Sequence, residues 1–272
     1  MEKFKASPAS LFQRFWKNRA LIFSLASREV ATRYRGTFGG LLWALVQPIM
    51  MLAIYTFVFS VIFKSRWEHS NSSDAEYALI LFIGLFVFQV FSECINRAPG
   101  LIVGNVNYVK KVLFPLEVLP IVVLYSSLFQ LAVSFIVWSV AYTYFIGFPS
   151  ATGVYFPFVL VPLLFISLGF SWLLASLGVY VRDISQIINI LTTVLFFMSP
   201  IFYPISAVPD RFHIYYKLNP VTYAVETSRD VLFFGRVPSF STWAVWLCIS
   251  IFVAWIGYFW FQKTRKGFAD VL

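Results

Sequence analysis

The stretch that decides the fold is residues 118–181, which read VLPIVVLYSSLFQLAVSFIVWSVAYTYFIGFPSATGVYFPFVLVPLLFISLGFSWLLASLGVYV. These 64 residues contain no Asp, Glu, Lys or Arg, and Glu117 and Arg182 bound the run. A helix that crosses a bilayer needs about 20 predominantly apolar residues, so the run is too long for one crossing and suits two. Turn-forming residues lie near its middle, at 147–153 (GFPSATG). The run therefore predicts two membrane-spanning helices joined by a turn.

The composition of the whole chain agrees with a membrane protein. Of its 272 residues, 60% are hydrophobic and 12% are charged, and the mean hydropathy is +0.78. A soluble domain carries about 25% charged residues. Uncharged runs predict six spans, at about 37–63, 77–96, 118–146, 154–181, 184–204 and 239–262. We therefore expect an all-α membrane protein with a single transmembrane domain over residues 1–272.

Basic residues are distributed unevenly along the chain, and this predicts its orientation. With six spans both termini lie on one side of the membrane, and 15 of the 21 Lys and Arg residues then fall on that side. Basic residues favour the cytoplasmic side, so both termini are expected there. The net charge of +9 is then explained by topology and anionic lipid rather than by nucleic acid.

Residues 7–34 have the pattern of an amphipathic helix that lies on the membrane surface. Ser7 and Pro8 suit the N-cap and the first helical position, and a break is expected near Asn18. Four large apolar side chains fall on one face: Leu11, Phe12, Phe15 and Trp16. A spanning helix through 20–27 is the alternative, but eight uncharged residues are too few for it. The sequence favours an interfacial helix.

The segment 97–115 connects the second and third predicted spans. It is moderately apolar and is bounded by Pro99-Gly100 and Pro115. Four apolar residues of a short helix in it would share one side: Leu101, Ile102, Val106 and Val109. That side could dock a protein, or the helix could rest on lipid headgroups with two lysines toward the phosphates. Composition leaves both interpretations open.

Residues 205–238 follow the fifth predicted span on the outer side and do not read as an ordinary polar loop. Asn219-Pro220 suits the start of a helix, and 222–234 can form a short helix closed by Gly235. Glu226 and Arg229 are spaced to pair on it. Aromatic residues crowd the region, so we expect short, half-buried, re-entrant helices here.

Residues for catalysis, metal binding or ATP binding do not cluster in this sequence. Its twelve acidic residues are scattered, its two histidines are far apart in the sequence, and no Gly-x4-Gly-Lys-Ser/Thr loop is present. Glu93 lies near the end of the second span, and pairing with Arg97 is favoured over a proton relay. We therefore expect no enzyme activity, no metal site and no cofactor in this chain.

Aromatic residues are abundant: 32 Phe, 14 Tyr and 9 Trp. Tyr55, Phe59 and Phe63 recur every fourth residue of the first span, and four more gather at the outer end of the fifth: Phe196, Phe197, Phe202 and Tyr203. Aromatic faces suit sugar rings, whereas the same spacing is also typical of helix packing. The pattern alone leaves both open.

Three motifs in order resemble the permeases of type-2 ABC exporters, in the polysaccharide-export branch. They are REVATRYRGTFGGLLWALVQP at 28–48, KKVLFPLEVLP at 110–120, and the pair SPIFYP at 199–204 and LNPVTY at 218–223. The resemblance covers nearly the whole chain. It implies a homodimer of six-span permeases with two copies of a separate ATPase subunit, which would hold the ATP and Mg. The Gln47-Pro48 pair is more similar to O-antigen exporters than to capsule exporters.

The resemblance also implies roles for individual residues. The loop at 97–111 becomes a cytoplasmic coupling helix that docks on the ATPase, through Arg97, Leu101, Ile102, Val106, Asn107, Tyr108 and Lys110. An aromatic channel for the glycan is expected at Tyr55, Phe59, Phe63, Phe196, Phe197 and Tyr203. The outer re-entrant region is expected to use Tyr215, Tyr216, Tyr223, Glu226 and Arg229.

The implied function is export of a lipid-linked glycan across the bacterial inner membrane. O-antigen of lipopolysaccharide is the leading substrate. Teichoic acid, capsule or a drug are alternatives within the family, and a membrane glycosyltransferase or acyltransferase is the alternative outside it.

Overall fold

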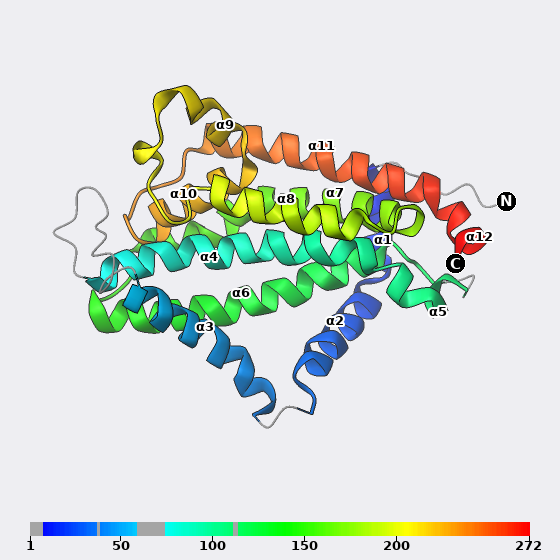
Figure 1. Cartoon of the computed structure of the whole chain (residues 1–272), viewed down its shortest axis with the longest axis horizontal. Helices are drawn as coiled ribbons and strands as arrows, with labels where there is room; N and C mark the ends of the chain where they lie inside the picture. Colours follow the sequence, from blue (N-terminus) through cyan, green and yellow to red (C-terminus); the bar gives the residue numbers. More distant parts are fainter. Residues whose placement is uncertain (1–7, 37–38, 59–73, 111–113) are drawn as a thin grey trace.

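The computed structural model describes residues 8–36, 39–58, 74–110 and 114–272. Within these ranges the regular elements are helices and no strand is present. The long helices run side by side along the longest axis of the molecule (Figure 1). The predicted all-α fold is confirmed.

In the described ranges the α-helices are α1 (Pro8–Lys17), α2 (Arg19–Tyr34), α3 (Trp43–Tyr55), α4 (Asp74–Arg97), α5 (Val106–Val109), α6 (Val118–Phe145), α7 (Phe156–Tyr180), α8 (Ile184–Met198), α9 (His213–Leu218), α10 (Pro220–Leu232), α11 (Phe240–Thr264) and α12 (Phe268–Val271). Short 3-10 helices flank several of them, at Gly40–Leu42, Ala98–Gly100, Val103–Asn105, Ala151–Tyr155, Ile205–Ala207, Asp210–Phe212 and Arg265–Gly267.

Five helical stretches of the described chain are long and apolar enough to cross a membrane: Gly40–Val58, Ala75–Gly100, Val118–Phe145, Ala151–Tyr180 and Phe240–Val271. The sixth predicted span, at 184–204, corresponds to α8, which is apolar but has only 15 residues. Such a helix is about 22 Å long, whereas the hydrocarbon core is about 30 Å thick. The structure therefore supports five spans and one shorter apolar helix.

The uncharged run that opened the sequence forms α6 and α7. The helix α6 ends at Phe145 and a 3-10 turn at Ala151–Tyr155 leads into α7. Gly147 has φ +123°, a conformation that residues with a Cβ rarely adopt. The prediction of two helices joined by a glycine turn is confirmed.

The helices α7 and α11 pack closely because glycines remove side chains from their contact. A Cβ on Gly257 would lie 2.0 Å from the backbone oxygen of Gly169. Small residues at such contacts let helix backbones approach, which is how helices associate in lipid.

Two fully buried tryptophans connect other parts of the bundle by hydrogen bonds. Trp138 Nε1 of α6 donates to Leu79 O of α4 at 3.1 Å, and Trp172 Nε1 of α7 donates to Glu117 O at 3.0 Å.

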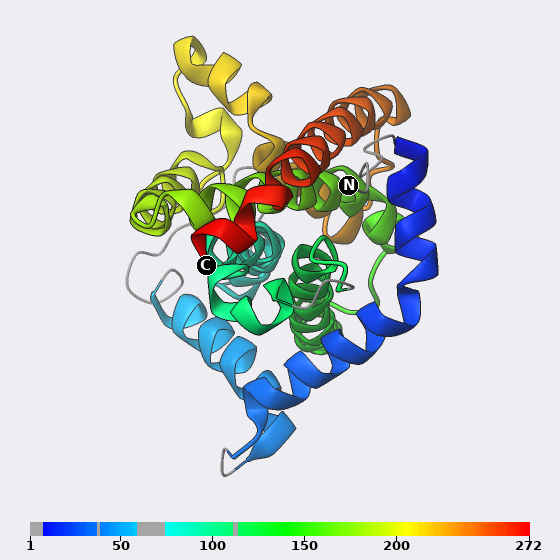
Figure 2. The same ribbon diagram turned by 90° about the vertical axis from the view of Figure 1, so that its right-hand side faces the viewer.

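The N-terminal helices lie outside the bundle. The predicted break near Asn18 is present, since α1 ends at Lys17 and α2 begins at Arg19. Figure 2, which looks along the bundle, shows α1 and α2 running across its axis along one side. The helix α2 buries Ile22 and Ala26. In contrast, α3 stands off the bundle (Figures 1 and 2), and only 11% of the apolar 18-residue stretch within Gly40–Val58 is buried.

The two ends of the bundle carry different short segments (Figure 1). One end holds α5 and α12, and we call it the α12 end. The other end holds the turn between α6 and α7, the segment after α8, and α9 and α10, and we call it the α9 end.

Candidate functional site

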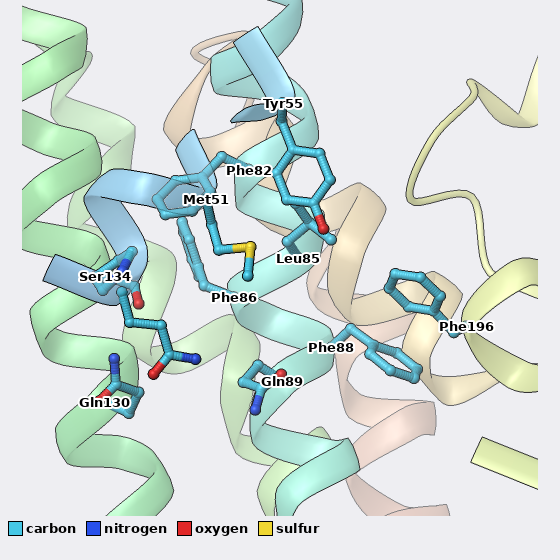
Figure 3. A pocket seen from close by; sticks show the side chains of 12 residues that line it. Met51, Tyr55, Phe82, Leu85, Phe86, Phe88, Gln89, Gln130, Ser134 and Phe196 are labelled. Atoms are coloured by element: carbon cyan, nitrogen blue, oxygen red, sulfur yellow. The ribbon is translucent and has the colours of Figure 1, made fainter. Parts of the chain in front are cut away.

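A hollow of about 200 Å³ lies between α3, α4, α6 and α8 (Figure 3). Its lining combines amides, hydroxyls, aromatic rings and aliphatic side chains: Gln47, Pro48, Met51, Tyr55, Phe82, Leu85, Phe86, Phe88, Gln89, Gln130, Ser134 and Phe196. None of these described lining residues carries a charge. We call this the amide hollow.

One of its three amides is held in place by neighbouring helices. Gln130 of α6 is buried; its Oε1 accepts from the Tyr34 hydroxyl of α2 at 2.8 Å, and its Nε2 donates to Ala44 O of α3 at 3.3 Å. Gln130 therefore joins three helices and forms a fixed wall of the hollow.

The other two amides have no hydrogen-bond partner within the described part of the chain. Gln47 of α3 and Gln89 of α4 are both exposed. The exposure of Gln89 is unusual for α4, because 78% of the apolar 18-residue stretch within Ala75–Gly100 is buried. Amides without partners are unfavourable in hydrocarbon. The side of the hollow that they form therefore suits water, a polar ligand or another polar surface.

Aromatic rings also line the hollow. Phe88 of α4 and Phe196 of α8 have centroids 5.0 Å apart, and Phe202 meets Phe196 edge-on at 5.0 Å and Tyr55 at 6.5 Å. Two residues of the predicted channel, Tyr55 and Phe196, are thus brought to one site (Figure 3).

The remaining predicted channel residues do not join them there. Phe197 packs against Phe196 at 5.4 Å, but it is exposed and does not line the hollow. Tyr203 lines a second hollow at the α9 end. Phe59 and Phe63 lie outside the described residues. Among the described residues, then, the predicted set is divided between two hollows.

The second hollow has a volume of about 430 Å³ and is lined by aromatic and aliphatic side chains: Met198, Tyr203, Ala207, Val208, Pro209, Phe212, Tyr215 and Tyr216. The Tyr203 hydroxyl donates to Phe197 O at 2.7 Å and lies 2.8 Å from that of Tyr216. Tyr223 is not part of this site, because its ring stacks on Trp246 of α11 at 5.7 Å.

Arg229 of α10 is the buried charged residue that holds the α9 end together. It is 1% exposed and donates to the carbonyl oxygens of Ile80, Pro200 and Ile201 at 3.1, 2.5 and 2.6 Å. It also donates to Glu226 at 2.8 Å, as the spacing predicted. One guanidinium thus connects α10, α4 and the segment after α8.

The start of α10 also follows its sequence prediction. The Asn219 side chain accepts from Val221 N at 2.9 Å and donates to Ser199 Oγ at 3.0 Å. Asn219 is therefore the N-cap of α10, with Pro220 as its first residue, and the same side chain fixes the end of α8. Gly235, with φ +66°, follows the helix.

The predicted coupling loop is a series of short helices at the α12 end, and the structure corrects its predicted docking face. Leu101 and Ile102 are buried in the core, Ile102 with 0% exposed. They face the bundle because the loop packs on α7, where a Cβ on Gly178 would lie 2.1 Å from Pro99 O. The side chains of the loop that reach the surface include Val103, Asn107 and Lys110; Val106 and Tyr108 are half-buried.

Two carboxylates hold arginines on either side of this loop. Before it, Glu93 pairs with Arg97 at 3.2 Å, as predicted, and also with Arg33 of α2. Arg97 in turn contacts Glu29 of α2 at 2.5 Å. The end of α4 is thereby tied to α2.

After the loop, Glu117 is buried and accepts from Arg14 of α1 at 2.8 Å and from Arg265 at 2.6 Å. Arg265 also donates to Phe114 O at 2.6 Å. The start of α6 is therefore tied to α1 and to the end of α11.

The ion pairs of Glu117 with Arg14 and Arg265 were not predicted from the sequence. Glu117 was recognised only as the boundary of the uncharged run, and its partners lie 103 and 148 positions away. An acidic residue directly before a span was the signal that could have identified it, because such a residue requires a cationic partner when it is buried.

Comparison with known proteins gives a family match. The sequence pattern of the ABC-2 type transporter family matches residues 20–233. This covers more than half of the chain.

Curated relatives match over nearly the whole chain. The O-antigen export system permease protein RfbA of Myxococcus xanthus is 26% identical over 262 residues, which are 96% of this chain and 98% of that protein. A protein of the same name from Klebsiella pneumoniae is 23% identical over 93% of this chain and 95% of its own length. The polysialic acid transport protein KpsM of Escherichia coli is 24% identical over 88% and 92%.

Proposed function

We propose that this chain, which belongs to the ABC-2 type transporter family, is the membrane subunit of an ATP-driven exporter of lipid-linked polysaccharide, with O-antigen as its substrate. The observation that carries this proposal is the similarity to O-antigen export permeases over nearly the full length of both chains. The apolar spans, and the two hollows that combine aromatic and polar groups, support the same conclusion.

Energy for export comes, in this proposal, from a separate ATPase subunit that binds ATP and Mg. The full sequence contains no Gly-x4-Gly-Lys-Ser/Thr loop. The partner docks on the exposed residues of the loop at 98–110, among them Val103, Asn107 and Lys110. Ion pairs flank this loop on both sides, and they link the docked partner to the ends of α4 and α6.

The functional unit in this proposal contains two copies of the chain. Most of the apolar stretch Gly40–Val58, which contains α3, is not buried. Its exposed side chains include Leu42, Trp43 and Met50. A second copy packed near α3 and α8 would enclose the amide hollows of both chains and provide a shared path for the glycan. Such association in lipid relies on close helix packing.

The α12 end faces the cytoplasm of a bacterial inner membrane in this arrangement, and the α9 end faces outward. The excess of Lys and Arg on the terminal side supports this orientation. The helices α1 and α2 then lie along the cytoplasmic interface, α8 completes a sixth span, and α9 and α10 are outer re-entrant helices.

The test is reconstitution of export in cells that make lipid-linked O-antigen and express this chain with its ATPase. We expect glycan at the cell surface, and its loss when the ATPase loses its catalytic carboxylate. Continued export with that ATPase variant would contradict the proposal. Chemical change of labelled glycan by the purified chain alone would instead indicate a membrane transferase.

A further inference from the structure

Two glutamines without a hydrogen-bond partner in the described chain line the amide hollow, and export by itself does not require them. Gln47 and Gln89 lie near the middles of the stretches Gly40–Val58 and Ala75–Gly100. Both line the same hollow, are exposed, and make no hydrogen bond within the described chain. Two unpaired amides at this depth call for an occupant that can hydrogen-bond with them.

The rest of the lining limits the chemistry of that occupant. An amide both donates and accepts hydrogen bonds, and hydroxyl groups do the same. The rings of Tyr55, Phe88 and Phe196 offer apolar faces beside the amides. Among the described lining residues there is no Lys or Arg to neutralise an anion and no Asp or Glu to attract a cation. An uncharged molecule with hydroxyl groups and one apolar face fits this lining.

The volume limits its size. Sites for drug-sized ligands span about 300–1,000 Å³, and this hollow has about 200 Å³. It therefore has room for one ring rather than for a stretch of chain. A lipid chain would leave both amides unpaired.

We propose that the amide hollow binds one uncharged sugar ring of the glycan, with Gln47 and Gln89 hydrogen-bonded to its hydroxyl groups and aromatic side chains against its apolar face. This inference rests on the proposed function, and it adds that the chain selects uncharged sugars over those that carry a carboxylate or phosphate at this point of the path.

The first experiment compares Gln89→Leu and Gln47→Leu with the native chain in the export assay. Loss of one net hydrogen bond predicts a fall in export rate of about fivefold for each variant. Gln186→Leu is the matched control, because Gln186 is an exposed amide of α8 that does not line the hollow. Unchanged export by both hollow variants, with export intact in the native chain, would overturn the sugar site. Absence of export in the native chain would instead contradict the proposed function.

The second experiment detects the occupant directly. Cys248 is exposed and Cys94 is buried, so Gln89→Cys in a Cys248→Ser background places one accessible thiol in the hollow. A small water-soluble maleimide should label it in cells that make no lipid-linked glycan, and glycan synthesis should protect it. Absence of labelling in both kinds of cell would indicate that lipid or a second copy fills the hollow, and equal labelling in both would show that no sugar binds. Either result overturns the proposal.

The third experiment tests the selectivity. Cells expressing the transporter make either an uncharged glycan or one that carries a carboxylate on each repeat, on the same lipid carrier. The uncharged glycan should be exported faster, and Gln89→Leu should reduce that preference. Equal export of both glycans by the native chain would overturn the assignment of an uncharged ring.

Discussion

At the α9 end one buried arginine holds α10 against the bundle, whereas at the α12 end two carboxylates each hold two arginines. Arg229 donates mainly to backbone carbonyls, of Ile80, Pro200 and Ile201. Glu93 and Glu117 instead bind side chains on α1, α2, α4 and the segment after α11.

The difference lies in what can replace each contact. The Pro200 and Ile201 carbonyls lie outside the helices and accept from Arg229, so the contact at the α9 end tolerates little change. The arginines at the α12 end are partly exposed, Arg33 by 32% and Arg97 by 36%, and water can solvate them when the ion pair opens. The α9 end therefore has a fixed geometry, while the ion pairs around the loop at 98–110 can rearrange at modest free-energy cost.

The largest effect is expected from Arg229→Met. It leaves three carbonyl groups and Glu226 without their donor, and breaking a buried charged pair costs about 3–5 kcal/mol. We expect a strong loss of folded protein and a lower melting temperature of the purified chain, followed by tryptophan fluorescence. Arg229→Lys should recover only part of the stability, because one ammonium cannot reach the same set of acceptors. An unchanged melting temperature in Arg229→Met would show that the α9 end is not held as described.

A smaller effect is expected from Glu117→Gln. The carboxylate is 4% exposed, but its two arginines remain partly accessible, so we expect a loss of roughly 2 kcal/mol in the free energy of unfolding. Hydrogen exchange should become faster in α1 and in residues 265–272, which lose their shared partner. Asp183→Asn is the control, since Asp183 is an exposed acid whose side chain makes no cap bond. Unaltered exchange in α1 would argue against Glu117 as its anchor.

Glu93→Gln should have a weaker effect, of about 1 kcal/mol, because solvent screens its partners. The difference in stability between the native chain and this variant should shrink as salt is raised, since screening weakens exposed pairs more than buried ones. Glu117→Gln should show less dependence on salt. The same salt dependence in both variants would remove the distinction between the two carboxylates.

The smallest effect is expected from Asp230→Asn at the α9 end. Asp230 and Arg236 are 3.4 Å apart; Arg236 is exposed and Asp230 is half-buried, so water screens the pair and we expect a change within about 0.5 kcal/mol. This variant tests whether the effect of Arg229→Met comes from its burial or merely from its location at the α9 end. A loss of stability comparable to that of Arg229→Met would show that any charged residue at this end is critical, contrary to the role assigned to Arg229.

Much of the fold could be predicted because its signals are local. The absence of charge over residues 118–181 and the glycine turn within it predicted α6 and α7. Asn219-Pro220 predicted the start of α10, and the spacing of Glu226 and Arg229 predicted their pair. Each of these features depends on neighbours in the sequence, as helix caps and pairs three residues apart do.

The sequence does not tell which side of a helix its neighbours cover. Leu101 and Ile102 were expected on a docking face, but both are buried in the core where the loop packs on α7 at Pro99. The predicted aromatic channel is divided between two hollows, because α8 ends at Met198 and the chain then turns at Ser199–Pro200. Periodicity places residues on one face of a helix and does not say which helix lies opposite.

The sequence by itself determined that this chain is a bundle of apolar helices and where most of them begin and end. These follow from hydrophobicity and local hydrogen bonding, which act over a few residues. Only the tertiary structure decided that Arg229 reaches Ile80, 149 positions away, that Glu117 joins Arg14 to Arg265, and that Gln47 and Gln89 face one hollow. Such contacts depend on the rotation of each helix about its axis, which is set by packing among distant segments.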